Sequence, residues 1–172
     1  LKKNIIFNFN TYQEILKKIN YFNFLLFSSI LSSGILTQLI KHVTGRPRPN
    51  ELNLENEFGL KFFTIDSNFH SFPSGHTSTI VAVALVISLM APKLKYFFYL
   101  LAIIVSFSRV VVGAHYISDI IGGMAVAFIG FKFSILILSK IFNINKKNDM
   151  LPVINDNFKL AILSCILLSV FL

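Results

Sequence analysis

Residues 19–40 read INYFNFLLFSSILSSGILTQLI, and this stretch sets the fold class. It holds 22 residues without a charged side chain. At about 1.5 Å per residue, a helix of this length crosses a hydrocarbon core of about 30 Å. Because lipid offers no partner to backbone N–H and C=O groups, such a span must be helical. The sequence therefore predicts a transmembrane helix over Ile19–Ile40.

Further apolar runs follow this one along the chain. They predict helices over Pro73–Met90, Tyr96–Val112 and Tyr116–Ser139, and a further helix that begins near Phe158. Pro73–Met90 and Tyr96–Val112 are short for a bilayer, which local thinning or interfacial anchoring accommodates. We expect an all-α, polytopic transmembrane bundle of about five helices in this segment.

The composition supports a membrane protein. Of the 172 residues, 54% are apolar and only 14% are charged, whereas a soluble domain carries roughly a quarter charged residues. The net charge of +8 comes from small clusters between apolar runs. A nucleic-acid-binding protein instead presents a contiguous basic face, so we expect a lipid bilayer and no nucleic acid as partner. The lone Cys165 excludes an intramolecular disulfide, and we interpret it as a packing residue.

The distribution of basic residues predicts the orientation in the membrane. If the helices alternate, ten lysines lie on one side and five basic residues on the other, namely Lys41, Arg46, Arg48, Lys61 and Arg109. Positive residues favour the cytoplasmic side. We therefore expect a multi-pass protein of the cytoplasmic membrane whose 40s loop and 109–119 segment face outward.

The first polar cluster on this outward side is KHVTGRPRP, residues 41–49. Lys41 taken alone is typical of an interfacial anchor. Arg48 is flanked by Pro47 and Pro49, which hold it in extended backbone. A rigidly presented guanidinium suits bidentate binding of a phosphate.

The second cluster is FPSGHT, residues 72–77, at the start of an apolar run. Pro73 suits the first position of a helix, and the amides that follow it are unsatisfied donors that favour an anion. Gly75 permits a ligand to approach closely. The alternative for this cluster by itself is an ordinary helix start with His76 at the interface, but the pattern favours an anion site.

The third cluster is SRVVVGAHYISD, residues 108–119. His115 and Asp119 are four residues apart, so on a helix they share one face. The carboxylate then orients the imidazole as a histidine nucleophile or base requires. Arg109 ends the preceding helix, and Gly113 breaks the chain before the next. A structural salt-bridge cluster is the alternative, but three polar clusters on one face favour a functional site.

Taken in order, Lys-x6-Arg-Pro, Pro-Ser-Gly-His and Ser-Arg-x5-His-x3-Asp resemble the type 2 phosphatidic acid phosphatase (PAP2) superfamily. Its members include lipid phosphatases, bacterial acid phosphatases and vanadium haloperoxidases. The resemblance implies a helical bundle that hydrolyses phosphomonoesters or diphosphates through a phosphohistidine, without a metal or cofactor.

The resemblance also implies a role for each matching residue. His115 corresponds to the nucleophile, Asp119 to the carboxylate that orients it, and His76 to the acid that protonates the leaving oxygen. The phosphoryl group is then bound by the cations and by hydrogen-bond donors, namely Lys41, Arg48, Arg109, Ser74 and Gly75. These roles fit the chemistry, because phosphoryl transfer is catalysed mainly by positioning and by neutralising charge on the oxygens.

We expect residues 1–172 to form a single membrane-embedded domain with its active-site region at 41–119. The chain starts with Leu1, and a single helix precedes Lys41 where membrane members of the family commonly have two. We therefore expect a segment of a longer protein. Lys132, within a predicted helix, is expected to extend toward the cytoplasmic interface. Residues 51–71 are either an interfacial loop or a lip that admits a lipid headgroup.

The function predicted first is an outward-facing phosphatase of lipid phosphates or diphosphates, such as undecaprenyl diphosphate, phosphatidylglycerophosphate, phosphatidate or lipid A. A phosphotransferase with the same chemistry is the nearest alternative, because an alcohol can replace water as acceptor. A haloperoxidase is disfavoured by the membrane composition. A non-enzymatic binding or transport protein leaves the pairing of His115 with Asp119 unexplained.

Overall fold

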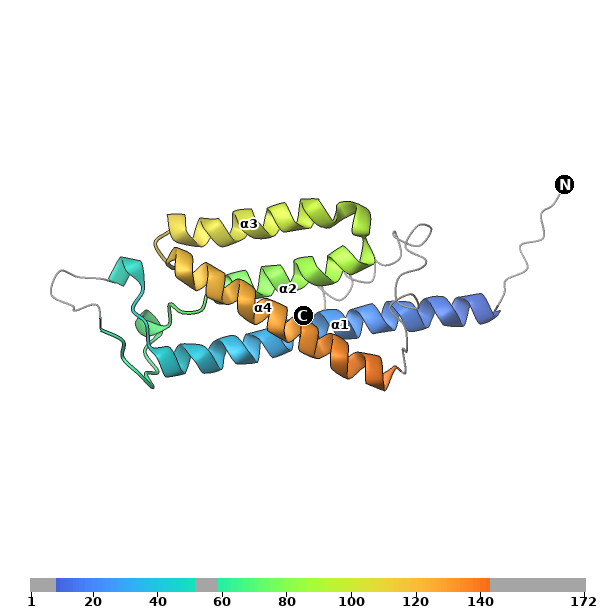
Figure 1. Cartoon of the computed structure of the whole chain (residues 1–172), viewed down its shortest axis with the longest axis horizontal. Coiled ribbons are helices and arrows are strands. Elements are labelled where there is room, and N and C mark those ends of the chain that lie inside the picture. Colours follow the sequence, from blue (N-terminus) through green and yellow to red (C-terminus); the bar gives the residue numbers. More distant parts are fainter. Residues whose placement is uncertain (1–8, 52–58, 143–172) are drawn as a thin grey trace.

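The computed structural model describes residues 9–51 and 59–142 (Figure 1). Four long helices dominate: α1 (Phe9–Thr44), α2 (Gly75–Met90), α3 (Lys95–Val111) and α4 (Ile117–Ile141). Three short 3-10 helices, η1 (Pro49–Glu51), η2 (Ser67–Phe69) and η3 (Pro92–Leu94), lie in the connections. No strand occurs among the described residues. The predicted all-α fold is confirmed.

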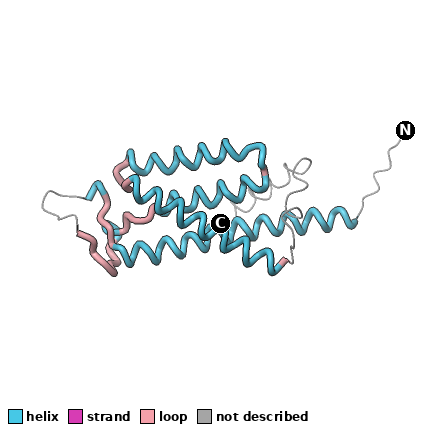
Figure 2. The backbone as a smooth tube through the Cα atoms, in the orientation of Figure 1, coloured by secondary structure: helices cyan, strands magenta, loops and turns pink. Residues whose placement is uncertain are grey.

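The long helices run lengthwise and alternate in direction. The carboxyl ends of α1 and α3 and the amino ends of α2 and α4 lie at the same end of the molecule (Figure 1). The long connection between α1 and α2 and the short one between α3 and α4 are at that end (Figure 2). The three polar clusters of the sequence are therefore brought to one end of the bundle, which we call the site end.

Three predicted helix starts or ends differ from the structure. α1 begins at Phe9, ten residues before the predicted start at Ile19. α1 continues to Thr44, so Lys41 lies within its last turn and not after it. α2 begins at Gly75, with Ser74 as its N-cap, so Pro73 precedes the helix and does not occupy its first position. The hydroxyl of Ser74 accepts a hydrogen bond from the backbone N–H of Thr77, and this cap moves the helix start past the proline.

The predicted bounds of two further helices agree with the structure, and one predicted helix lies outside the described residues. α3 and α4 cover the ranges expected from the sequence, within a few residues at each end. The helix expected from Phe158, like Cys165, lies outside the described residues. Leu16–Thr44, Pro92–Val111 and Ile117–Ile141 are long and apolar enough to cross a membrane, while α2 is a shorter apolar helix. These are the helices of a multi-pass membrane protein.

The apolar core lies away from the site end. It is formed by the first half of α1, the end of α2 and the second half of α4, through Tyr21, Phe22, Leu25, Val86, Met90, Phe131 and Leu138. Leu25 and Val86 have no exposed surface. Burial of large side chains here holds the three helices together at the end opposite the polar clusters.

Nearer the site end the helices approach closely through small residues. The hydroxyl of Ser32 in α1 donates a hydrogen bond to the carbonyl of Gly130 in α4, at 3.1 Å. A Cβ placed on Gly130 would lie 2.8 Å from the amide nitrogen of Ser33. Small residues at such crossings allow backbones to come together in a membrane, so α1 and α4 meet without large side chains between them.

Lys132 in α4 lies on the exposed surface of the bundle. Its ammonium is 5.4 Å from the centroid of the Phe128 ring, one turn nearer the amino end of α4. Helical side chains lean toward the amino end, and a cation over an aromatic face is stabilised. The lysine therefore extends toward the amino end of α4. The sequence predicted the opposite direction, toward the carboxyl end of the helix and the cytoplasmic interface.

Replacement of Gly130 by alanine is expected to destabilise the bundle. The new methyl group would contact the backbone of Ser33, which cannot rotate away, so α1 and α4 would have to separate. Overpacking of this kind costs typically about 1–3 kcal/mol. The measurement is the melting midpoint in detergent. Gly34→Ala is the matched control, because a Cβ on Gly34 has no neighbour within 4 Å. Equal midpoints for the two variants would contradict this packing.

Candidate active site

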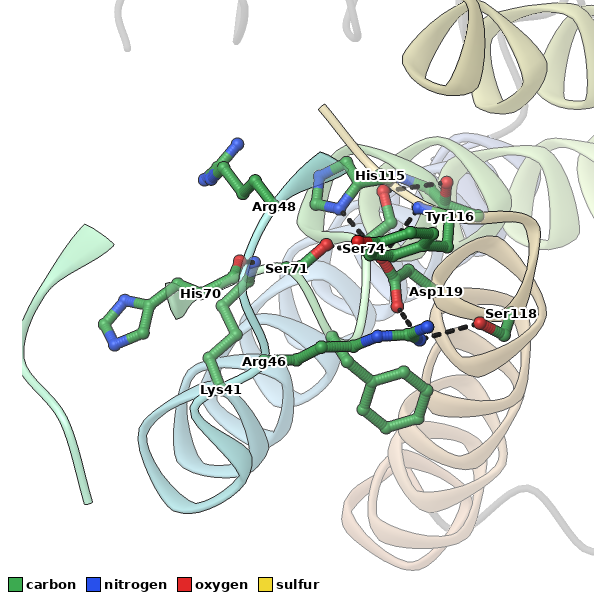
Figure 3. Close-up of polar contacts among 12 residues, drawn as sticks. Lys41, Arg46, Arg48, His70, Ser71, Ser74, His115, Tyr116, Ser118 and Asp119 are labelled. Atoms are coloured by element: carbon green, nitrogen blue, oxygen red, sulfur yellow. Dashed lines mark hydrogen bonds and ion pairs between the residues drawn. The ribbon is translucent and has the colours of Figure 1, made fainter. Parts of the chain in front are cut away.

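Asp119 is the most enclosed ionisable residue of the site end. Its side chain has no exposed surface, and it is the third residue of α4. Oδ2 accepts hydrogen bonds from the Ser71 hydroxyl at 2.5 Å and from the backbone N–H of Tyr116 at 2.8 Å. Oδ1 pairs with the guanidinium of Arg46 at 2.7 Å (Figure 3). Both oxygens of the buried carboxylate are therefore satisfied.

His115 faces the same carboxylate, as the sequence predicts. Its Nδ1 lies 3.6 Å from Oδ2 of Asp119, which is ion-pair distance but longer than a hydrogen bond. His115 precedes α4, whose N-cap is Tyr116, so the two residues do not share a helix face. The turn before α4, where Gly113 has a φ of 73°, brings the buried ring over the helix start instead.

A cavity of about 600 Å³ opens beside His115. Five of the eight predicted site residues line it, namely Lys41, Arg48, Gly75, His76 and His115. Ser74, Arg109 and Asp119 do not line it. Thr37, Ser67, His70 and Ser78 add further polar groups to the wall. The structure thus brings residues from all three sequence clusters around one space.

Lys41 and Arg48 enter this cavity from the end of α1 and from the loop that follows it. The ammonium of Lys41 is buried and donates to the backbone carbonyl of His70. The Arg48 side chain donates from Nε to the carbonyl of Ser67 at 3.1 Å, while its backbone N–H donates to Asn68. Both cations are held by backbone oxygens, so their positions do not depend on a bound anion. Figure 3 shows the Lys41 side chain beside His70.

His76 and Arg109 complete the set of charged groups. His76 lies in the first turn of α2 and is close enough to His115, Lys41 and Arg109 for their charges to interact with it. Arg109 lies in the last turn of α3, and its Nε is buried without a hydrogen-bond partner among the described residues. A buried donor without a partner is costly, which suits a group that binds an anion.

Ser74 is placed differently from what the resemblance implies. It is fully buried and does not line the cavity. Its hydroxyl oxygen accepts from the backbone and side chain of Thr77, and its backbone N–H donates to the carbonyl of Asp119. Ser74 therefore joins the start of α2 to the start of α4, and a contact between Ser74 and a phosphoryl group stays a prediction.

Two residues of the site were not singled out from the sequence. Arg46 lies between Lys41 and Arg48 in the first cluster, and Ser71 immediately precedes the second. Neither residue belongs to a spacing pattern, because their partner Asp119 is more than forty positions away. The one available signal for Arg46 was its place among the basic residues of the outward side.

The connection between α1 and α2 forms one wall of the cavity. Ser67 and His70 of this segment line it. The side chains of Leu60, Phe62, Phe63 and Ile65 are exposed, with Ile65 at 88% of its full accessible surface. Aromatic and apolar residues at such a position suit the bilayer interface. That this segment admits a lipid headgroup stays a prediction, and residues 52–58 lie outside the described residues.

No group of three or more His, Cys, Asp or Glu residues is clustered within residues 9–51 and 59–142 in a way that suits a metal ion. The charged groups at the cavity are instead cations with a single buried carboxylate behind them. Such a donor set fits an oxyanion and not a metal. The expectation that the reaction needs no metal or cofactor stays a prediction.

The structure is an apolar helical bundle of a membrane protein, in which an imidazole and two cations line one cavity beside a buried carboxylate. Residues 22–143 match the family model of the PAP2 superfamily. The chain belongs to this superfamily, which confirms the resemblance seen in the sequence.

Curated relatives cover part of the chain. A lipid A 1-phosphatase of Rhizobium etli is 39% identical over 100 residues, which are 58% of this chain and 43% of that protein. A lipid A 1-phosphatase of Rhizobium johnstonii is 40% identical over 100 residues, 58% of this chain and 41% of that protein. The chain thus matches about two fifths of the length of these relatives. No solved structure matches it significantly.

Replacement of Lys41 by glutamine is expected to weaken the binding of inorganic phosphate. The change removes a buried positive charge from the cavity wall. A hydrogen bond to a charged group contributes about 1.5–3 kcal/mol, so the dissociation constant should rise roughly 10- to 100-fold. Calorimetric titration measures it. Lys61→Gln is the control, because Lys61 is at the same end but outside the cavity wall. Equal losses in both variants would contradict a specific role.

Proposed function

We propose that the chain is an integral-membrane phosphatase that hydrolyses lipid phosphate or diphosphate headgroups on the extracytoplasmic side, through a phosphohistidine intermediate. The observation that carries the proposal is the buried pair of His115 and Asp119 beside a cavity lined with cations. This arrangement supplies a nucleophile and an environment for a phosphoryl group, and its residues match the motifs of the superfamily.

In the first step His115 attacks phosphorus. Its Nδ1 faces Asp119, which leaves Nε2 as the nitrogen that forms the bond. The bond from phosphorus to the lipid oxygen breaks, and the protonated ring of His76 gives its proton to that oxygen. Lys41, Arg48 and Arg109 neutralise the charge on the phosphoryl oxygens, which is the main demand of this reaction.

In the second step a water molecule attacks the phosphohistidine. His76, now neutral, accepts a proton from the water, while the bond between phosphorus and Nε2 breaks. Inorganic phosphate leaves, and both histidines return to their starting states. An alcohol in place of water gives a phosphotransferase, so the products of the reaction distinguish the two functions.

The substrate class follows from the surroundings of the cavity. Three helices of the described chain are long and apolar enough to cross a membrane. The segment that lines the cavity with Ser67 and His70 also carries exposed apolar side chains at Phe62, Phe63 and Ile65. A phosphate carried on a lipid reaches such a cavity from the bilayer surface. Both relatives are named lipid A 1-phosphatase, so we propose lipid A 1-phosphate as the first substrate to test.

The decisive experiment follows phosphate release from a panel of lipid phosphates by the purified chain in detergent. His115→Ala is expected to abolish release, because no other group then forms the covalent intermediate. Rapid quenching with labelled substrate should trap acid-labile, base-stable phosphate on the wild type, and excess EDTA should leave activity unchanged. His42→Ala is the matched control, since His42 is exposed and outside the cavity wall. Normal turnover by His115→Ala would refute the mechanism.

The orientation is tested by labelling single cysteines in a Cys165→Ser background. Lys61 lies at the site end and Lys93 at the opposite end, and both are exposed. A membrane-impermeant maleimide on intact cells, with any outer membrane permeabilised, should label Lys61→Cys at once. Lys93→Cys should react only after the cytoplasmic membrane is broken. The reverse pattern would place the cavity on the cytoplasmic side, where an extracytoplasmic lipid is out of reach.

A further inference from the structure

Arg46 is a cation at the site end to which the motifs give no role. Its Nη1 lies 2.7 Å from Oδ1 of Asp119 and 2.7 Å from the hydroxyl of Ser118. Its guanidinium carbon is 4.1 Å from the centroid of the Tyr116 ring. Two hydrogen bonds and a ring contact therefore fix this side chain against the start of α4.

Arg46 does not face the cavity that contains His115. That cavity is lined by Lys41 and Arg48 but not by Arg46. Arg46 instead lines a second cavity of about 610 Å³, together with Thr44, Pro47, Leu60, Phe72 and Tyr116. In Figure 3 the guanidinium approaches Asp119 from the side away from His115. The arginine is thus directed at the carboxylate and not at the space where a phosphoryl group would bind.

The two oxygens of Asp119 have separate partners. Oδ2 faces His115 and accepts from Ser71 and Tyr116, whereas Oδ1 pairs with Arg46. With both oxygens held, the carboxylate cannot rotate, and the direction it presents to the imidazole is fixed. Outer partners of this kind orient a functional histidine.

We propose that Arg46 is a positioning residue for His115 and acts through Asp119. The proposal rests on the proposed function, in which His115 is the nucleophile. The ion pair with Arg46 keeps Oδ2 of Asp119 directed at Nδ1 of His115.

A positioning role predicts a change in turnover without a change in oxyanion binding. Arg46→Ala should lower kcat roughly 10- to 100-fold, the usual effect of removing an outer partner of a functional histidine. The inhibition constant of inorganic phosphate should remain within about twofold, because Lys41 and Arg48 still line the cavity. Lys41→Gln is the control, in which the inhibition constant rises.

Chemical rescue separates positioning from a purely structural role. Arg46 is partly exposed, at 29% for its side chain, and forms part of the second cavity. Arg46→Ala therefore leaves a space that methylguanidinium can enter from solvent to pair with Asp119. Added methylguanidinium should restore at least part of the lost kcat, whereas sodium chloride at equal ionic strength should not. His115→Ala should stay inactive with either salt.

A second variant keeps the test decisive if Arg46→Ala does not fold. Arg46→Lys retains the charge but loses the planar guanidinium that lies over the Tyr116 ring and fixes the direction of the hydrogen bonds, so kcat should fall while the phosphate inhibition constant is unchanged. The proposal is overturned if a folded variant keeps wild-type kcat, if its loss appears as weaker phosphate binding, or if methylguanidinium fails to reactivate folded Arg46→Ala.

The same experiments distinguish this proposal from the proposed function. A wild-type chain that releases no phosphate from any lipid in the panel contradicts the phosphatase, and the role of Arg46 with it. An active wild type combined with Arg46 variants of normal turnover contradicts the positioning role alone.

Discussion

A carboxylate with no exposed surface must find partners within the protein, and Asp119 finds them in three separate parts of the chain. The loop after α1 supplies Arg46, the residue before the second motif supplies the hydroxyl of Ser71, and the turn before α4 supplies the N–H of Tyr116. An unpaired buried charge would be strongly destabilising. The start of α4 therefore holds the loop segments in place, and the imidazole of His115 is presented over the same point.

The two halves of the bundle are packed by different kinds of side chain. Large apolar side chains such as Leu25 and Val86 pack at the end opposite the site. Toward the site end, Ser32 and Gly130 let α1 and α4 come together without large side chains. Close backbone contact and a wide cavity thus occur in the same half, because small residues join α1 and α4 there. Large apolar side chains stabilise one half, and the buried partners of Asp119 stabilise the other.

Much of this architecture is predictable from the sequence, because long charge-free runs have few structural options in a membrane. The same holds for the residues around the cavity, since motif spacing identifies Lys41, Arg48, His76 and His115. Arg46 and Ser71 were not predicted from the sequence, because their partner Asp119 is distant in the chain. No local sequence pattern indicates such a tertiary contact. The start of α2 was misplaced because the cap provided by Ser74 outweighs the preference of Pro73 for a first turn. The direction of Lys132 depends on its contact with the ring of Phe128, which charge counting does not include.

The cations around the cavity have a consequence for the protein without a ligand. Lys41 and Arg48 both line the cavity and are held there by backbone carbonyls, so their mutual repulsion is present whenever the space is empty. An anion that enters relieves this repulsion. Any ligand that binds only the folded state raises its stability. We therefore expect phosphate to stabilise the fold, and the choice of buffer anion to affect the stability of the protein after extraction from its membrane.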